Sequence, residues 1–238
     1  MKIRIVMKTR KILIIFGLLF GTTIYASNVT TKNITKITVQ DTEFTYQYTI
    51  NYDSQNRIIK IVPDHSEIFG ITRIEYGTNT FRISKGDIFV SCSLNEHGYI
   101  EVAKDGDFPV SLVGNMFYNE KGQLSSIEDG DENLLFNWEN NDMMQMSFQD
   151  EQIDVSYTTL ENKNQFGLFL KIDEENCTPV FPYYMLLGKA TQHLPESVGQ
   201  GEQKVSYQYK TDKDGFVTEI TMIYPNNSKT VFYRFTYE

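Results

Sequence analysis

Residues 44–50 read Phe-Thr-Tyr-Gln-Tyr-Thr-Ile, so large apolar side chains alternate with polar ones. Alternation with a period of two, carried by aromatic and β-branched residues, predicts a strand with one buried face. Shortly afterwards comes Asp53-Ser54-Gln55-Asn56, which is a turn signal because Asp and Asn tolerate the positive φ of tight hairpins. A strand followed by such a turn is the unit from which we predict the whole fold.

The same unit returns along the chain, and apolar residues at helical spacing are nearly absent. The turn markers are spaced 19 to 24 residues apart, which leaves about seven residues for each strand of a hairpin. The markers are Asn56, Asn79, Gly98, Gly122, Asn141 and Asn164. Alternating strands are carried by Ile153, Val155 and Tyr157, by Val205, Tyr207 and Tyr209, and by Val231, Tyr233, Phe235 and Tyr237.

Hairpins that follow one another so regularly predict an all-β protein, an antiparallel up-and-down meander. Such a meander curls because strands twist, and it ends either as a closed barrel or as an open wrapped sheet. The sequence leaves these two forms open.

One segment, residues 174–203, interrupts the alternation and holds three of the six prolines. Within it, 182–188 begins with Pro and ends with Gly, which predicts a short helix. We expect 189–203 to be a loop. Because 183–187 are five consecutive bulky side chains, we predict that the segment plugs or caps the sheet.

The first 26 residues predict export. Five Lys and Arg residues precede an apolar run over 12–24, and Ala26 and Ser27 offer small residues for cleavage. A run of thirteen is shorter than the roughly 20 residues that a membrane anchor needs. We therefore expect a signal peptide at 1–26 and a single domain at 27–238, although the exact cleavage site stays open. No Cys follows the apolar run, so we do not expect a lipoprotein.

Removing this basic stretch takes the formal charge from −9 to −14. A surface so acidic repels phosphates, so nucleic acid is excluded as a partner. The predicted location is the periplasm, the cell surface or the extracellular space. The exported chain carries Cys92 and Cys177, and the sequence does not decide between a disulfide and two buried thiols.

No metal, cofactor or catalytic site is predicted. The acidic run at 128–133 has oxygen ligands for Ca²⁺, but it contains the hairpin signal Asp129-Gly130 and is expected to be a solvated turn. Asp212-Lys213-Asp214-Gly215 resembles the start of an EF-hand loop, with the Gly two positions too early.

The remaining candidates are isolated in the sequence. His65, His97 and His193 have no partner at metal-ligand spacing, and a nucleophilic pair of Cys177 with His193 has no local support. Carboxylates at glycosidase separation cannot be recognised from sequence. The 31 aromatic residues could stack on sugars, yet most occupy core positions, and Trp138 is expected to be packed.

Several short motifs resemble an exported bacterial domain-of-unknown-function family with a porin-like fold. They are Leu186-Leu187-Gly188-Lys189, Leu194-Pro195, the strand at 205–209 and the turn at 212–215. The aromatic hairpins at 44–58 are distantly similar to Tyr-Asp repeat proteins. The resemblance implies a porin-like fold, no reaction and no catalytic residues, and many members look like lipoproteins, from which this chain departs by lacking the acceptor Cys.

Export, repetition and absent site chemistry lead us to expect a non-enzymatic scaffold or binding protein of the cell envelope, with an unknown protein or a glycan as partner. Two alternatives remain. One is an integral outer-membrane barrel, which needs strands of about 9–11 residues with a lipid-facing apolar band. The other is a glycan-acting enzyme.

Overall fold

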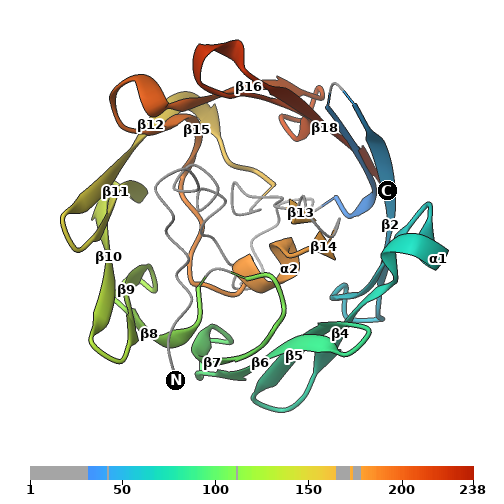
Figure 1. Ribbon diagram of the computed structural model, residues 1–238, viewed down its shortest axis with the longest axis horizontal. Coiled ribbons are helices and arrows are strands. Elements are labelled where there is room, and N and C mark those ends of the chain that lie inside the picture. Colours follow the sequence, from blue (N-terminus) through green and yellow to red (C-terminus); the bar gives the residue numbers. More distant parts are fainter. Residues whose placement is uncertain (1–31, 42, 111, 165–171, 174–177) are drawn as a thin grey trace.

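The computed structural model describes residues 32–41, 43–110, 112–164, 172–173 and 178–238. Consecutive antiparallel strands form a closed barrel, which β1 completes by pairing with β18 (Figure 1). The predicted all-β meander is confirmed, and it takes the closed form. The sixteen barrel strands are β1 (Ile34–Gln40), β2 (Thr45–Tyr52), β3 (Ile58–Pro63), β4 (Thr72–Tyr76), β5 (Thr80–Lys85), β6 (Ile88–Leu94), β7 (Ile100–Gly106), β8 (Gly114–Tyr118), β9 (Leu124–Asp129), β10 (Glu132–Glu139), β11 (Asp142–Phe148), β12 (Glu151–Glu161), β15 (His193–Gly199), β16 (Val205–Thr211), β17 (Val217–Ile223) and β18 (Thr230–Tyr237).

Few other elements occur in the described part of the chain. A small separate sheet pairs β13 (Ile172–Asp173) with β14 (Thr178–Pro179). The α-helices are α1 (Ser66–Phe69) and α2 (Phe181–Tyr184), and short 3₁₀ turns cover Gly201–Gln203 and Pro225–Asn227.

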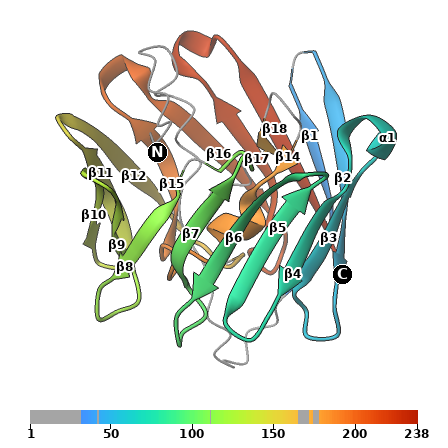
Figure 2. The ribbon, with the colours of Figure 1, turned by 60° about the horizontal axis from the view of Figure 1, so that its bottom comes forward.

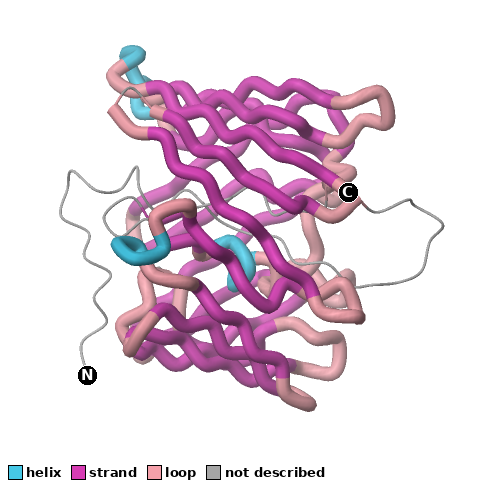
Figure 3. The backbone as a smooth tube through the Cα atoms, turned by 90° about the vertical axis from the view of Figure 1, so that its right-hand side faces the viewer, coloured by secondary structure: helices cyan, strands magenta, loops and turns pink. Residues whose placement is uncertain are grey.

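Because neighbouring strands run in opposite directions, their connections fall alternately at two ends of the barrel (Figure 3). We call one end the Asx rim; it carries the β2–β3, β4–β5, β6–β7, β8–β9, β10–β11 and β16–β17 connections. The other is the α1 rim, which carries the β1–β2, β3–β4, β5–β6, β7–β8, β9–β10, β11–β12, β15–β16 and β17–β18 connections.

Four turns of the Asx rim share one hydrogen-bond pattern. In the first, Asp53 Oδ1 accepts the backbone N–H groups of Gln55 (2.8 Å) and Arg57 (3.0 Å), while Asn56 takes a φ of 58°. The side chain thus replaces backbone partners that the sharp turn removes, and Asn or Gly at the fourth position tolerates the left-handed conformation. The other three turns begin at Asn95, Asn119 and Asp212, with Gly98, Gly122 and Gly215 at positive φ.

Inward-facing aromatic side chains near this rim tie six of the barrel strands to the strand before each of them. Tyr52, directly before its turn, donates its hydroxyl hydrogen to the carbonyl oxygen of Ile34 on β1 (2.9 Å). Burial raises the pKa of Tyr52 to about 12, so the hydroxyl remains a donor. The same bond recurs from Tyr118 to Ile100 (2.6 Å), Trp138 to Leu124 (2.7 Å), Tyr157 to Met143 (2.7 Å), Tyr209 to Pro195 (2.8 Å) and Tyr237 to Val217. The predicted packing of Trp138 is confirmed.

The inner wall of the barrel is apolar, with side chains such as Ile37, Ile61 and Ile83 fully buried. Barrels of sixteen strands are wide enough to leave a channel when nothing else enters them. Here α2 lies inside the ring of strands (Figure 1), and Tyr183 and Leu187 have no exposed surface. The predicted plug is therefore confirmed for the described residues from Val180 to Leu187.

A second segment enters the barrel from the opposite end. The β7–β8 connection buries Phe108 and Leu112, whose exposed fractions are 2% and 6%. The Tyr183 hydroxyl of α2 donates to the carbonyl oxygen of Leu112. Segments from both rims therefore share the interior with the side chains of the wall.

After α2 the chain follows the Asx rim as a strap, which we define as Leu186–Gln192. It exchanges backbone hydrogen bonds with three successive hairpins and so holds the plug in the mouth of the barrel. The bonds run from Ile100 N to Leu186 O (2.9 Å), from Lys189 N to Gly122 O (2.8 Å) and from Gln192 N to Asn141 O (3.1 Å).

Two details of the prediction over 174–203 are wrong. The helix is shorter than 182–188, and the loop expected over 189–203 contains β15. Pro195 hid this strand, since Pro cannot donate to a sheet ladder; here it lies where the pairing with β12 shifts register next to Tyr157. Residues 1–31, with the predicted signal peptide, and residues 174–177 lie outside the described ranges.

Replacing Gly188 with Ala should destabilise the protein. Gly188 has a φ of +98°, and an added Cβ would lie 2.8 Å from the Gly122 carbonyl oxygen and 2.9 Å from Tyr118 Cε1. The matched control is Gly130→Ala, since Gly130 also has positive φ (+63°) but nothing within 4 Å. We expect urea unfolding to show that Gly188→Ala costs about 1–3 kcal/mol more than the control. Equal losses would mean that the strap does not need this close approach.

Replacing Leu187 with Ala tests the plug. Leu187 is fully buried, so its truncation should cost about 2–5 kcal/mol in free energy of unfolding. Leu135, which is 52% exposed on the outer face, provides the control, and Leu135→Ala should change stability by less than about 0.5 kcal/mol. An unchanged melting temperature for Leu187→Ala would instead place this apolar segment at the surface, as a docking patch.

Candidate functional site

The outer face of the barrel is mostly polar. On β16, for example, Ser206, Gln208 and Lys210 are exposed, whereas the alternating Val205 and Tyr207 are buried. Exposed apolar side chains on the strands are few and scattered: Ile59, Phe117, Leu135 and Leu160. The wall is therefore apolar toward the interior and polar toward the outside.

Charged groups form a ladder across four neighbouring strands of this outer face. Glu219 on β17 accepts hydrogen bonds from Lys210 Nζ on β16 (2.5 Å) and from Arg234 Nε on β18 (2.8 Å). Arg234 Nη1 also donates to Gln40 Oε1 on β1 (2.8 Å). The bond from Lys210, and then that from Arg234, lowers the pKa of Glu219. The ladder crosses the β1–β18 seam that closes the barrel.

Helix α1 stands out at its rim next to β2 (Figure 2). Ring contacts join aromatic residues of this region, and we call the cluster the α1-rim patch: Phe44, Tyr46, His65, Ile68 and Phe69. The ring of Phe44 stacks on Tyr46 with centroids 5.9 Å apart, and Tyr46 meets the edge of Phe69 at 5.4 Å. Phe44 is 53% exposed and Ile68 is 71% exposed. Phe44 was expected in a half-buried strand, but β2 begins one residue later and leaves it in the turn.

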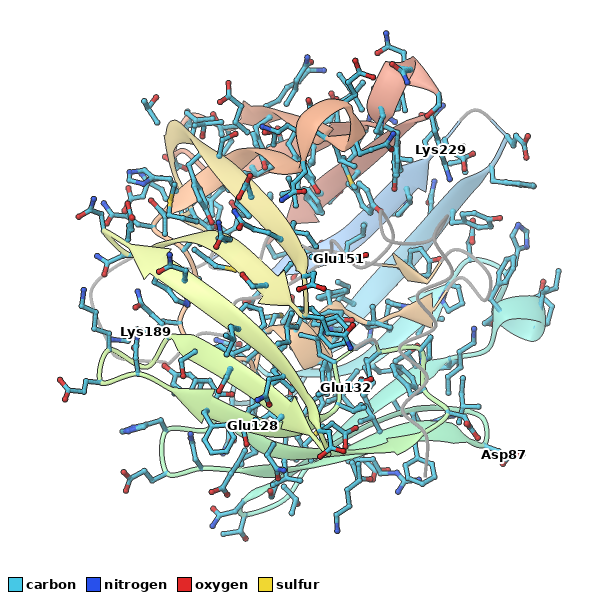
Figure 4. The ribbon with its side chains drawn as sticks, turned by 60° about the vertical axis from the view of Figure 1, so that its left-hand side comes forward. Asp87, Glu128, Glu132, Glu151, Lys189 and Lys229 are labelled. Atoms are coloured by element: carbon cyan, nitrogen blue, oxygen red, sulfur yellow. The ribbon has the colours of Figure 1, made fainter. Side chains whose placement is uncertain are left out.

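The backbone next to the patch is fixed by Asp41. Its Oδ1 accepts the N–H groups of Glu43 (2.8 Å) and Phe44 (2.7 Å), and its Oδ2 lies 3.5 Å from Lys229. The carboxylate therefore holds Phe44 in its exposed position. Figure 4 shows Lys229 at the α1-rim end of the molecule and Lys189 of the strap at the opposite end.

The two acidic segments considered as calcium sites in the sequence, 128–133 and 212–215, form hairpin turns. Asp129 pairs with Glu132 across a two-residue connection whose Gly130 has a φ of 63°, so the predicted hairpin at 128–133 is confirmed. Asp212 opens one of the four Asx turns, and Lys32 Nζ bridges it to Asp214 at 2.6 Å from each carboxylate. Among the described residues, no three His, Cys, Asp or Glu side chains are grouped so as to hold a metal ion.

His193 is brought to a partner that the sequence did not reveal. Its Nδ1 lies 2.7 Å from Asp142 Oδ2, and its backbone N–H donates to Asp142 Oδ1 (2.9 Å). The two residues are 51 positions apart, at the starts of β15 and β11, so only the barrel brings them together. Asp142 uses both oxygens to hold the end of the strap. The pair thus fastens β15 to β11 directly after the strap, and we call it the latch.

The other sequence candidates lie apart. His65 and His97 are exposed, with Glu67 and Glu96 nearby at 3.6 and 3.7 Å. Cys92 is a buried free thiol, and burial raises its pKa to about 12, which keeps it protonated and unreactive. Cys177, the other residue of the predicted pairs with Cys92 and with His193, lies outside the described residues.

No described helix has the length and apolar character that crossing a membrane requires.

Residues 50–219 match a family described as a domain of unknown function with porin-like fold (DUF4595). The crystal structure of a porin-like protein from Bacteroides uniformis superposes with a TM-score of 0.62 at 16% identity, covering 87% of this chain and 99% of that one. The crystal structure of a porin-like protein from Bacteroides vulgatus superposes with a TM-score of 0.46 at 13% identity, covering 86% of this chain and 98% of that one. A search of curated proteins gave no match.

The outer ladder should make stability depend on pH. The pKa of Glu219 is lower in the folded state than in the unfolded chain, so its ionisation stabilises the fold above its ordinary pKa, and this contribution is lost as the pH falls through the lowered value. Glu219→Gln should therefore be less stable than wild type at neutral pH, by under about 1 kcal/mol for an ion pair on the outer face, and equal to it in acid. Urea unfolding between neutral pH and pH 3 measures this; a difference that grows in acid would contradict the assignment.

Proposed function

Because this chain belongs to the family of unknown function with a porin-like fold (DUF4595), we propose that it uses that barrel as a non-enzymatic binding scaffold, exported to the cell envelope and surrounded by water. The observation that carries the proposal is the orientation of the wall, which faces its apolar residues inward and its polar residues outward. The basic and apolar stretch at 1–26 supports export to the periplasm, the cell surface or the medium.

The charged ladder favours water on the outside of the barrel. A Lys or Arg that faces lipid near the midplane costs about 2–4 kcal/mol, and a membrane barrel surrounds itself with a continuous apolar band. Lys210, Glu219 and Arg234 lie instead on adjacent strands of the outer face. Most barrel strands are also shorter than the roughly 9–11 residues that span a bilayer.

The second candidate is an integral outer-membrane barrel. An even number of antiparallel strands and complete closure are features of that class, and they favour it. A channel, however, requires an open lumen, whereas here α2 and the β7–β8 connection occupy the interior with fully buried side chains. We therefore place the binding surface of this protein on a rim and not in the lumen.

The side chains that could act as acids, bases or nucleophiles instead form contacts that stabilise the fold. This favours a binding function over a catalytic one. Asp142 and His193 bond to each other, and Asp212 supports its turn and binds Lys32. The thiol of Cys92 is buried. A glycan-acting enzyme would need two carboxylates facing a common space, and the acidic hairpin at 128–133 does not by itself provide one.

The test is to produce the chain without residues 1–26 in the absence of detergent. We expect a monodisperse species in size-exclusion chromatography with light scattering, because the outer face is polar and the net charge is −14. The same preparation should not float with liposomes or produce conductance in a planar bilayer. A protein that aggregates until detergent is added, and then forms channels, would establish the membrane barrel instead.

A further inference from the structure

Several aromatic rings of this protein are covered by its own cations. Arg82 lies over the ring of Phe89 at 3.8 Å, and Arg57 lies over Tyr76 at 4.5 Å, distances that give a favourable cation–π interaction. Further pairs join Lys32 to Phe216 (5.0 Å) and Arg234 to Phe232 (5.7 Å). The chain thus commonly places a Lys or Arg on an aromatic face.

The α1-rim patch differs in this respect. No Lys or Arg of the described residues lies over Phe44 or Phe69, although Phe44 is 53% exposed. The exposed charged residues that flank the patch in sequence are Glu43, Asp64 and Glu67, and the nearby cation Lys229 lies 3.5 Å from the Asp41 carboxylate. An aromatic face beside carboxylates attracts a cation by both the ring quadrupole and the negative charge.

The α1 connection is also larger than the topology requires. Eight residues, 64–71, join β3 to β4, whereas two residues suffice for the β5–β6, β9–β10 and β11–β12 connections of the same rim. None of the residues of α1 is buried, so the helix adds little to the core, and it leaves Ile68 71% exposed. An exposed apolar residue held out on an extended connection is a feature of interaction sites.

We propose that the α1-rim patch binds a basic peptide segment of a partner protein. A Lys or Arg side chain of the partner lies on the open face of Phe44, an apolar side chain packs on Ile68, and Glu43, Asp64 and Glu67 supply the opposite charge. This inference rests on the proposed scaffold function and specifies its partner. The apolar contact favours a peptide over a simple cation, and the acidic surroundings disfavour an anionic lipid surface.

The test measures fluorescence anisotropy of a labelled peptide in which Arg alternates with Leu, together with a matched peptide that has Glu in place of each Arg. Wild-type protein should bind the Arg peptide, and the affinity should fall as salt is added, because exposed charges are screened. Phe44→Ala should weaken binding about threefold or more, the range expected for one exposed cation–π contact. Glu67→Gln should also weaken it.

Phe117→Ala is the matched control, since Phe117 is 45% exposed on β8, away from this rim, and its removal should leave binding unchanged. Circular dichroism and melting of each variant show that the fold is retained. Equal losses in Phe44→Ala and Phe117→Ala, or no binding of the Arg peptide by wild type, would overturn the proposal. Preferential binding of maltoheptaose, or of vesicles containing phosphatidylglycerol, would replace it with another ligand class. If the protein is monodisperse without detergent but does not bind the Arg peptide as described, the proposed peptide site is wrong and the proposed scaffold function is unaffected.

Discussion

An apolar inner wall inside a closed barrel of sixteen strands has to be covered, and the rest of this structure depends on that constraint. Closure by β1 and β18 removes the sheet edges that would otherwise attract other chains. It also creates a lumen that wall side chains alone do not fill. An empty apolar lumen would forfeit the dispersion contacts and the burial that stabilise a core. Helix α2 and the β7–β8 connection provide the missing atoms, and Tyr183 links them through Leu112.

The wall itself is built from a repeated local unit. At the Asx rim, an Asp or Asn supports a turn with positive φ, and an inward aromatic hydroxyl or indole N–H reaches the carbonyl oxygen of the preceding strand. The Asx turn determines where the chain reverses direction, and the aromatic hydrogen bond joins neighbouring strands. Because these turns lie side by side at the same rim, the strap that follows α2 forms backbone hydrogen bonds with three successive hairpins.

The orientation of the wall constrains function more than the number of strands does. A closed barrel of sixteen strands is large enough to form a porin, but the wall of a porin is polar on the inside and apolar on the outside. Here the order is reversed, with apolar side chains facing inward and mostly polar side chains facing outward. Of the two rims, the α1 rim carries the exposed side chains of Phe44 and Ile68 together, beside the exposed carboxylates of Glu43, Asp64 and Glu67. The Asx rim is occupied by the strap and by the latch between His193 and Asp142.

The sequence by itself determined the strands, the turns, the buried plug and the family, because period-two alternation, Asx turn chemistry and a run of bulky residues are all local signals. It missed β15, since Pro195 masks a strand whose register shift accommodates it. Only the tertiary structure decided that the barrel closes, that Asp142 receives His193, and that Phe44, Tyr46 and Phe69 share one exposed cluster. Asp142 and His193 lie 51 positions apart, and the rings of Tyr46 and Phe69 come from β2 and α1, so these contacts depend on strand pairing that no local window of sequence contains.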